Sequence, residues 1–278
     1  MSSKPMSFKA KINNYAKSRH LPAQIVMQNV MFERLLDRLS RSEYRDKFVI
    51  KGGLLVSVIV GLDTRVTMDI DTTLRNASLT EEYLSEIVKE ICDIELDDDT
   101  FFHITGVELI RKDDIYGGYR VKLEALFEKI VTPLSIDVST GDVITPGAEK
   151  YNITGIMEEK NIITLWGYNV ETILAEKAET ILSRGILNTR PRDFYDVYIL
   201  VKQEKYDPAV FHEALRVTAE HRRSWDMIQD HNSVLDNILK NDTLRGLWEK
   251  YRKQFYYAKD ITFEDTVGAV RMLLEKKE

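Results

Sequence analysis

The chain has 278 residues, of which 44% are hydrophobic and 30% are charged, as in soluble globular proteins with one large or two ordinary domains. No apolar run approaches the roughly 20 residues of a membrane helix, and Cys92 is the only cysteine, so we expect a cytoplasmic protein without an internal disulfide or membrane contact. The net charge of −6 argues against a broad nonspecific nucleic-acid footprint but permits a local basic groove.

The first predicted elements lead to an acidic strand. Helical spacing of apolar residues predicts an amphipathic helix over about 22–40, followed by a short buried strand over 48–50. Gly52 and Gly53 then predict a tight turn that a ligand can approach closely. A short helix from Leu54 to about Val60 and a strand over 64–74 complete this region.

Asp69 and Asp71 are the first candidate site residues. Alternate residues of a strand point to the same face, so the two carboxylates should lie side by side, with Met68 and Ile70 facing a core. Paired carboxylates repel each other unless a cation lies between them, and Mg²⁺ is often held by one or two carboxylates together with substrate phosphates. The alternative is a pair of solvated positions on an edge strand.

The middle of the chain predicts a helix over 80–91 and three strands over 101–111, 119–127 and 134–138. The first two strands should form a hairpin, since Gly117 and Gly118 lie between them. Asp137 lies between two apolar residues of the last strand. It is either a surface residue or a third carboxylate beside Asp69 and Asp71, an arrangement that suits metal-dependent phosphoryl chemistry.

A turn-rich segment over 141–151 is the predicted domain boundary, and the chain reads as mainly helical from Asn169 onward. Lys177 lies on or beside an apolar helical stripe, from which its ammonium group either reaches solvent or binds a buried anion. Arg192 and Asp196 share a face of the next helix, and a salt bridge is the simplest interpretation. The basic-aromatic segment 250–257 is either a nucleic-acid surface or a half-buried helix face.

Four motifs in order resemble the AbiEii-type nucleotidyltransferases. They are Lys51-Gly52-Gly53, Arg65-x-Thr67-x-Asp69-Ile70-Asp71, Ser135-Ile136-Asp137-Val138, and Ala175-Glu176-Lys177 followed by Arg192-Asp193-Phe194-Tyr195-Asp196. That family comprises toxins of bacterial type IV toxin–antitoxin and abortive-infection (phage-defence) systems, within the DNA polymerase β-like superfamily. The motifs cover about residues 48–200, and the last is the most specific.

The resemblance implies a role for each matching residue. The catalytic residues would be Asp69, Asp71, Asp137, Lys177 and Asp196, and the metal ligands Asp69, Asp71 and Asp137. The nucleotide-binding residues would be Lys51, Gly52, Gly53, Arg65, Lys177 and Arg192. Many superfamily members have Gly-Ser where this chain has Gly52-Gly53, so backbone N–H groups would have to bind the phosphates here.

The predicted architecture is α/β (α+β), with a nucleotidyltransferase core of mixed sheet over 1–150 and a mainly helical part over 151–278 that completes the active-site cleft. The expected reaction transfers a nucleoside monophosphate from an NTP, with Mg²⁺ or Mn²⁺, to an acceptor such as the 3′ end of tRNA. The resemblance also implies an antitoxin partner or a kinase-like regulator. Two alternatives are a small-molecule nucleotidyltransferase of the antibiotic-modifying type and a non-catalytic NTP-binding protein.

Overall fold

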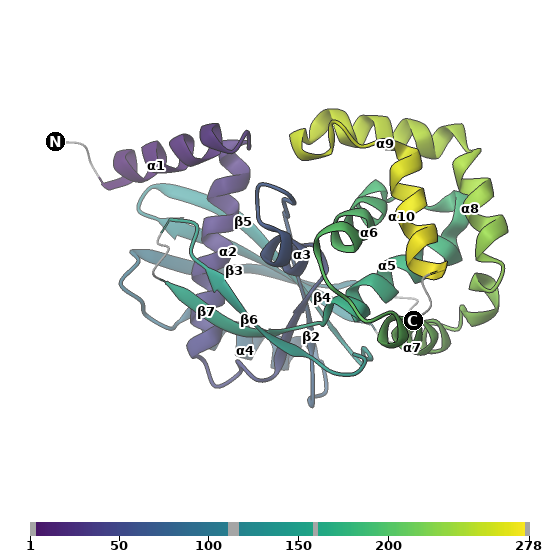
Figure 1. Cartoon of the computed structure of the whole chain (residues 1–278). Helices are drawn as coiled ribbons and strands as arrows, with labels where there is room; N and C mark the ends of the chain where they lie inside the picture. Colours follow the sequence, from purple (N-terminus) through teal and green to yellow (C-terminus); the bar gives the residue numbers. More distant parts are fainter. Residues whose placement is uncertain (1–3, 111–116, 158–160, 276–278) are drawn as a thin grey trace. The chain divides into compact units, whose positions relative to one another are not determined.

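In the computed structural model, which describes residues 4–110, 117–157 and 161–275, the strands form one mixed sheet (Figure 1). Its order is β3-β4-β5-β2-β1-β7-β6. The strands are β1 (Phe48–Lys51), β2 (Ile70–Leu74), β3 (Thr100–Ile110), β4 (Gly118–Phe127), β5 (Ile130–Thr140), β6 (Glu149–Thr154) and β7 (Ile162–Gly167). The pairs β2–β5 and β1–β7 are parallel and the other pairs are antiparallel, which confirms the expected α/β class with a mixed sheet.

The chain divides into two compact units, one formed by Met1–Asp142 with Glu149–Gly167 and the other by Val143–Ala148 with Tyr168–Glu278. This division differs from the expected 1–150 and 151–278. The difference arises because β6 and β7 follow the turn-rich segment but extend the sheet of the first unit, where β7 pairs with β1.

Helices of the first unit are α1 (Lys4–Ser18), α2 (Ala23–Arg41), α3 (Gly52–Val60) and α4 (Glu81–Cys92). Along β4, alternate residues from Val121 to Phe127 are buried, and they lie on the face that meets α1 and α2. Phe127 packs against Phe8 of α1 with ring centroids 4.5 Å apart, and Arg34 of α2 lies over the same ring. The face that carries Asp71 and Asp137 is therefore the opposite one.

The strand expected over 64–74 is shorter than predicted, because β2 begins only at Ile70. Side chains of α2 bind the preceding backbone: Asn29 donates to the carbonyl oxygen of Thr67 at 3.1 Å and Gln28 to that of Met68 at 3.0 Å. These carbonyl groups are satisfied by a helix rather than by a neighbouring strand. The expectation that Met68 faces a core is wrong, since 44% of this residue is exposed.

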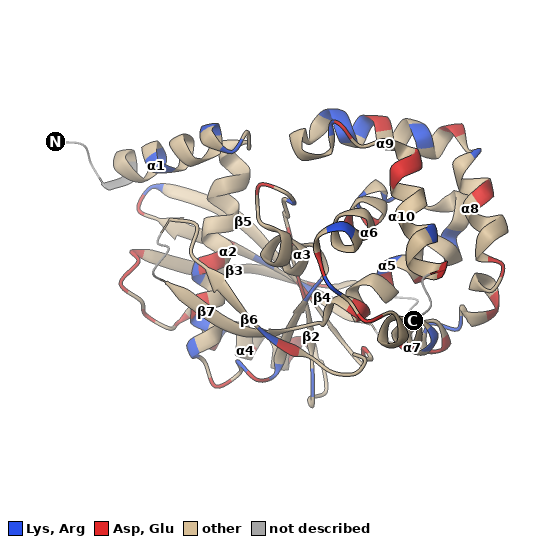
Figure 2. Ribbon diagram, in the orientation of Figure 1, with Lys and Arg blue, Asp and Glu red and all other residues tan. Residues whose placement is uncertain are grey.

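Helices make up most of the second unit: α5 (Val170–Arg184), α6 (Pro191–Gln203), α7 (Pro208–His221), α8 (His231–Leu239), α9 (Asp242–Gln254) and α10 (Phe263–Glu275), with short 3₁₀ turns over 185–187, 225–228 and 256–258. Asn169 caps α5 by accepting a hydrogen bond from the Thr172 N–H at 2.7 Å. On α9, Tyr251 is buried whereas Lys250 and Lys253 are exposed, so this segment is half buried with basic residues outside. Basic and acidic positions both occur along α9 (Figure 2).

No helix in the described part of the chain is both long and apolar enough to span a membrane.

Candidate active site

The three candidate aspartates come together on one face of the sheet. Asp71 of β2 and Asp137 of β5 are direct partners in the parallel pairing of these strands. Ser135, two residues before Asp137 and therefore on the same face, donates a hydrogen bond to Asp69 Oδ1 at 2.8 Å. The open question about Asp137 is thus settled in geometry: its side chain lies on the face of Asp69 and Asp71.

Gly52 brings the glycine pair against these carboxylates. The residue follows β1 directly and begins α3 with φ = +63°, so the expected turn is the first turn of a helix. A Cβ atom at Gly52 would lie only 2.2 Å from Asp71 Oδ2. A side chain is therefore excluded here both by backbone conformation and by space, and the N-terminal backbone of α3 lies next to Asp71.

Lys51 and Arg65 are both engaged inside the first unit. The ammonium group of Lys51 donates to Ser139 Oγ at 2.7 Å and to Asp142 Oδ2 at 2.5 Å. Burial would raise the pKa of Asp142, but the charge of Lys51 and hydrogen bonds from Lys51, Ser139 and Thr73 lower this pKa to about 2. Arg65 is buried, donates to the carbonyl oxygen of Val66, and packs its guanidinium against Gly53.

Arg120 is a site residue that the sequence analysis missed. From β4 it donates Nε to Asp137 Oδ1 and Nη2 to Asp137 Oδ2, both at 2.7 Å. This bidentate bond to Asp137 raises the pKa of Arg120 above its usual range; burial opposes the rise, and the charges of Asp69 and Asp71 add to it. The signal was present, because Val121, Leu123 and Ala125 alternate apolar and place Arg120 on the other, polar face.

Asp69 and Asp71 are the two carboxylates of the site that could hold a Mg²⁺ ion. The pair offers hard oxygen ligands beside a helix N-terminus, as suits an ion that shares its ligands with phosphate. Within the described ranges, however, no group of three or more His, Cys, Asp or Glu side chains is arranged to hold a metal. Both carboxylate oxygens of Asp137 accept hydrogen bonds from Arg120.

Lys177, Asp193 and Asp196 form an ion cluster in the second unit. The Lys177 ammonium of α5 lies 2.7 Å from Asp193 Oδ1 and 3.0 Å from Asp196 Oδ2, both on α6. The side chains are 15%, 3% and 0% exposed, respectively, so the cluster is nearly enclosed. The sequence suggested a salt bridge between Arg192 and Asp196. In the structure Asp196 pairs with Lys177 instead. The Arg192 guanidinium lies 5.8 Å from the ring centre of Phe255.

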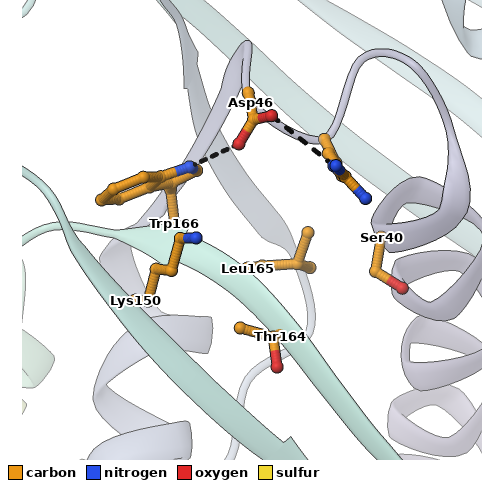
Figure 3. Close-up of a pocket in the computed structure, with 7 residues that line it drawn as sticks. Ser40, Asp46, Lys150, Thr164, Leu165 and Trp166 are labelled. Atoms are coloured by element: carbon orange, nitrogen blue, oxygen red, sulfur yellow. Dashed lines mark hydrogen bonds and ion pairs between the residues drawn. The ribbon is translucent and has the colours of Figure 1, made fainter.

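The first unit also contains a cavity of about 370 Å³ that holds none of the predicted site residues (Figure 3). Asp46 accepts a hydrogen bond from the Trp166 indole at 2.8 Å and pairs with Arg45 at 3.5 Å. The remaining lining residues are Ser40, Lys150, Thr164 and Leu165. This cavity lacks a carboxylate pair, and the chemistry predicted from the sequence belongs elsewhere.

Comparison with protein families assigns the chain. The family model described as "Nucleotidyl transferase AbiEii toxin, Type IV TA system" matches residues 34–269. The chain belongs to the AbiEii family. Membership confirms the resemblance, assigns nucleotidyltransferase activity with an NTP substrate, and implies an antitoxin partner. The match spans both units and includes all four motifs.

Two solved structures share the fold of this family member. A candidate nucleotidyltransferase from Helicobacter pylori has 16% sequence identity and a TM-score of 0.52, with 92% of this chain and 96% of that chain covered. JHP933, also from Helicobacter pylori, has 15% identity and a TM-score of 0.50, with 92% and 94% covered. No curated protein matches the sequence. At these identities the likeness establishes the fold alone.

Proposed function

We propose that the protein transfers a nucleoside monophosphate from an NTP to the 3′-terminal hydroxyl of tRNA in a Mg²⁺-dependent reaction. The observation that carries the proposal is the meeting of three features at one place in the first unit. These are the paired strand positions of Asp71 and Asp137, the Asp69 carboxylate, and the helix N-terminus at Gly52. Helix N-termini and carboxylate-bound Mg²⁺ are the two common protein partners of phosphate groups.

Asp69 and Asp71 would hold Mg²⁺, with Mn²⁺ as a substitute, and Asp137 would join them when Arg120 releases it. When bound, the ion neutralises charge on the α-phosphate and lowers the pKa of the acceptor hydroxyl. The hydroxyl oxygen forms a bond to the α-phosphorus and its proton passes to solvent. The bond from the α-phosphorus to the bridging oxygen breaks, and pyrophosphate leaves with that electron pair.

The chain's own groups would position the triphosphate. Backbone N–H groups at Gly52 and Gly53 point along the first turn of α3 and are suited to donate to phosphate oxygens. Lys177 and Arg192 are the proposed triphosphate-binding residues of the second unit, and Asp196 would hold Lys177 in place. Lys51, through its hydrogen bond to Asp142, and Arg65, which packs against Gly53, would hold the turn in place.

tRNA is the proposed acceptor, and two exposed lysines of α9 support it. Lys250 and Lys253 are exposed there, and exposed cations on one helix face are suited to a phosphate backbone. Because the net charge of the chain is −6, RNA would have to bind at a local basic surface of this kind.

The test uses purified protein with total bacterial tRNA, each α-³²P-labelled NTP in turn, and Mg²⁺. We expect label on tRNA with one NTP or a subset, no label with EDTA, and recovery with Mg²⁺ or Mn²⁺. Asp69→Asn should lower the rate at least about 100-fold, because it removes charge from the metal-binding pair. The matched control is Asp63→Asn, an exposed aspartate that pairs with Arg19.

Three results would change the assignment. Equal labelling by Asp69→Asn and the wild type would exclude Asp69 as a metal ligand. Triphosphate binding without labelled RNA would redirect the search to a small-molecule or protein acceptor. A wild-type protein that binds no triphosphate at all would contradict the proposal.

A further inference from the structure

We propose that Arg120 is a triphosphate-binding residue, which exchanges the Asp137 carboxylate for a phosphate group when the NTP and its metal bind. The proposal rests on the proposed function and adds a residue that none of the four motifs contains. Its consequence is that the third carboxylate becomes available only when substrate is present.

The position of Arg120 follows from the sheet register. Arg120 of β4 is the strand partner of Asp137, and Asp137 is the strand partner of Asp71. Arg120 therefore lies in the same cross-strand row as two of the three aspartates, on their face of the sheet. Neighbouring strands are about 4.8 Å apart, so a long arginine side chain in this row can reach phosphates bound at the adjacent carboxylates.

The partial exposure of the Arg120–Asp137 ion pair favours exchange of Asp137 for a phosphate group. The Arg120 side chain is 39% exposed and that of Asp137 is 19% exposed, so the pair lies at the surface of the first unit. Asp193 and Asp196, by contrast, hold Lys177 in nearly complete burial. Water can hydrate both partners of a partly exposed ion pair, and an incoming phosphate can take the place of Asp137 at Arg120.

The two proposed partners of Arg120, the Asp137 carboxylate and a phosphate group, accept hydrogen bonds in the same geometry. A guanidinium donates two parallel N–H bonds to a carboxylate or to a phosphate with the same planar fork. Leaving Asp137 for a phosphate oxygen pair preserves both charge-assisted hydrogen bonds of Arg120. Mg²⁺ meanwhile can take the place of the arginine at Asp137, so that neither charged partner is left unpaired.

A merely structural role is the competing interpretation, in which Arg120 only ties β4 to β5. Lys122 provides the comparison, since it lies on the same strand and face two residues away and pairs with Glu108 across to β3. Both residues are cations of one strand in cross-strand ion pairs. They differ in that only Arg120 pairs with a carboxylate of the candidate site.

The experiment compares Arg120→Gln, Arg120→Lys and the control Lys122→Gln in the full-length protein. Calorimetry measures the Kd of a non-hydrolysable α,β-methylene NTP with Mg²⁺, and electron paramagnetic resonance measures binding of Mn²⁺ alone. We expect Arg120→Gln to raise the triphosphate Kd about ten- to hundredfold, the range of one charge-assisted bond, and Lys122→Gln to leave it unchanged. Arg120→Lys should recover part of this loss, since lysine keeps the charge but not the fork.

The triphosphate Kd separates the two interpretations. With Asp137 released, Arg120→Gln should bind Mn²⁺ alone more tightly than the wild type while binding the triphosphate more weakly. An unchanged triphosphate Kd in a folded Arg120→Gln overturns the proposal, even where Mn²⁺ binds more tightly. If Arg120→Gln does not fold, an unchanged Kd in Arg120→Lys overturns it. A wild type without triphosphate binding overturns the proposed function as well.

Discussion

Gly52 couples the phosphate-facing backbone to the carboxylates through a single backbone position. Its φ of +63° lies in the left-handed region, and the space that a Cβ atom would need is taken by Asp71 Oδ2. A hydroxyl-bearing residue in the neighbouring position, as in many Gly-Ser members of the superfamily, is absent, and Gly53 packs against Arg65 instead. In the proposed mechanism, phosphate binding beside Asp71 would therefore depend on backbone N–H donors, which require a close approach of the ligand.

Gly52→Ala should destabilise the protein and lower transfer activity more than any loss of stability explains. The left-handed conformation alone costs a non-glycine residue about 1–2 kcal/mol, and the new methyl group would displace Asp71. Urea denaturation and tRNA labelling measure the two effects. Gly106→Ala is the control, since a Cβ atom at Gly106 meets no atom within 4 Å. Wild-type activity in Gly52→Ala would exclude this contact from the site.

How far the candidate site could be predicted differs from residue to residue. The spacing of Asp69 and Asp71 predicts that they lie close together, although the strand alternation holds only from Ile70 onward, where β2 begins. The pairing of Asp71 with Asp137 depends on the register between β2 and β5. These strands are neighbours in the sheet, but β3 and β4 lie between them in the sequence, so residue spacing could only suggest the pairing. Arg120 was missed because a lone cation on a polar strand face has no motif, and only its cross-strand partner reveals its function.

Among the elements, those with local signals were predicted well and those with tertiary causes were not. Thr80 and Asn169 cap α4 and α5 as expected, because a cap depends on residues three positions apart. The start of β2 was misplaced because α2 satisfies the backbone of residues 67 and 68. Helix α1 was not predicted, since its segment is basic and polar and its helical face is completed by packing of Phe8 on Phe127.

The ion pair of Lys51 and Asp142 joins the end of β1 to the segment after β5 and predicts a pH dependence of stability. The folded-state pKa of Asp142 is lowered to about 2, so its contribution is present above the unfolded pKa near 4 and is lost as pH falls from about 4 to 2. A shift of this size corresponds to about 2 kcal/mol at neutral pH.

Asp142→Asn should therefore lower the free energy of unfolding by about 2 kcal/mol at pH 7, and the difference from wild type should shrink below pH 4. Urea denaturation at pH 7, 4 and 3 tests both parts. The exposed pair of Arg19 and Asp63 supplies the control, because Asp63→Asn should change stability little at each pH. A difference that is constant across this pH range would show that the carboxylate charge of Asp142 is not what stabilises the strands.

The proposed catalytic residues fall in two units with different physical settings. Asp69, Asp71 and Asp137 belong to the first unit and are partly exposed, whereas Lys177 and Asp196 belong to the second and are nearly enclosed. If both groups serve the transfer reaction, loss of a carboxylate in either unit abolishes activity. The effects on stability should differ, because a partly hydrated carboxylate is easily replaced and one member of a buried ion cluster is not.

Asp69→Asn and Asp196→Asn test this division directly. Both should lose tRNA labelling, but Asp69→Asn should change the free energy of unfolding by less than about 1 kcal/mol, because water already reaches the site. Asp196→Asn leaves Lys177 with one fewer carboxylate in a buried cluster and should cost about 3–5 kcal/mol. Urea denaturation provides the measurement. A destabilised Asp196→Asn that still labels tRNA at the wild-type rate would make the cluster purely structural, and the catalytic role would then rest on the first unit alone.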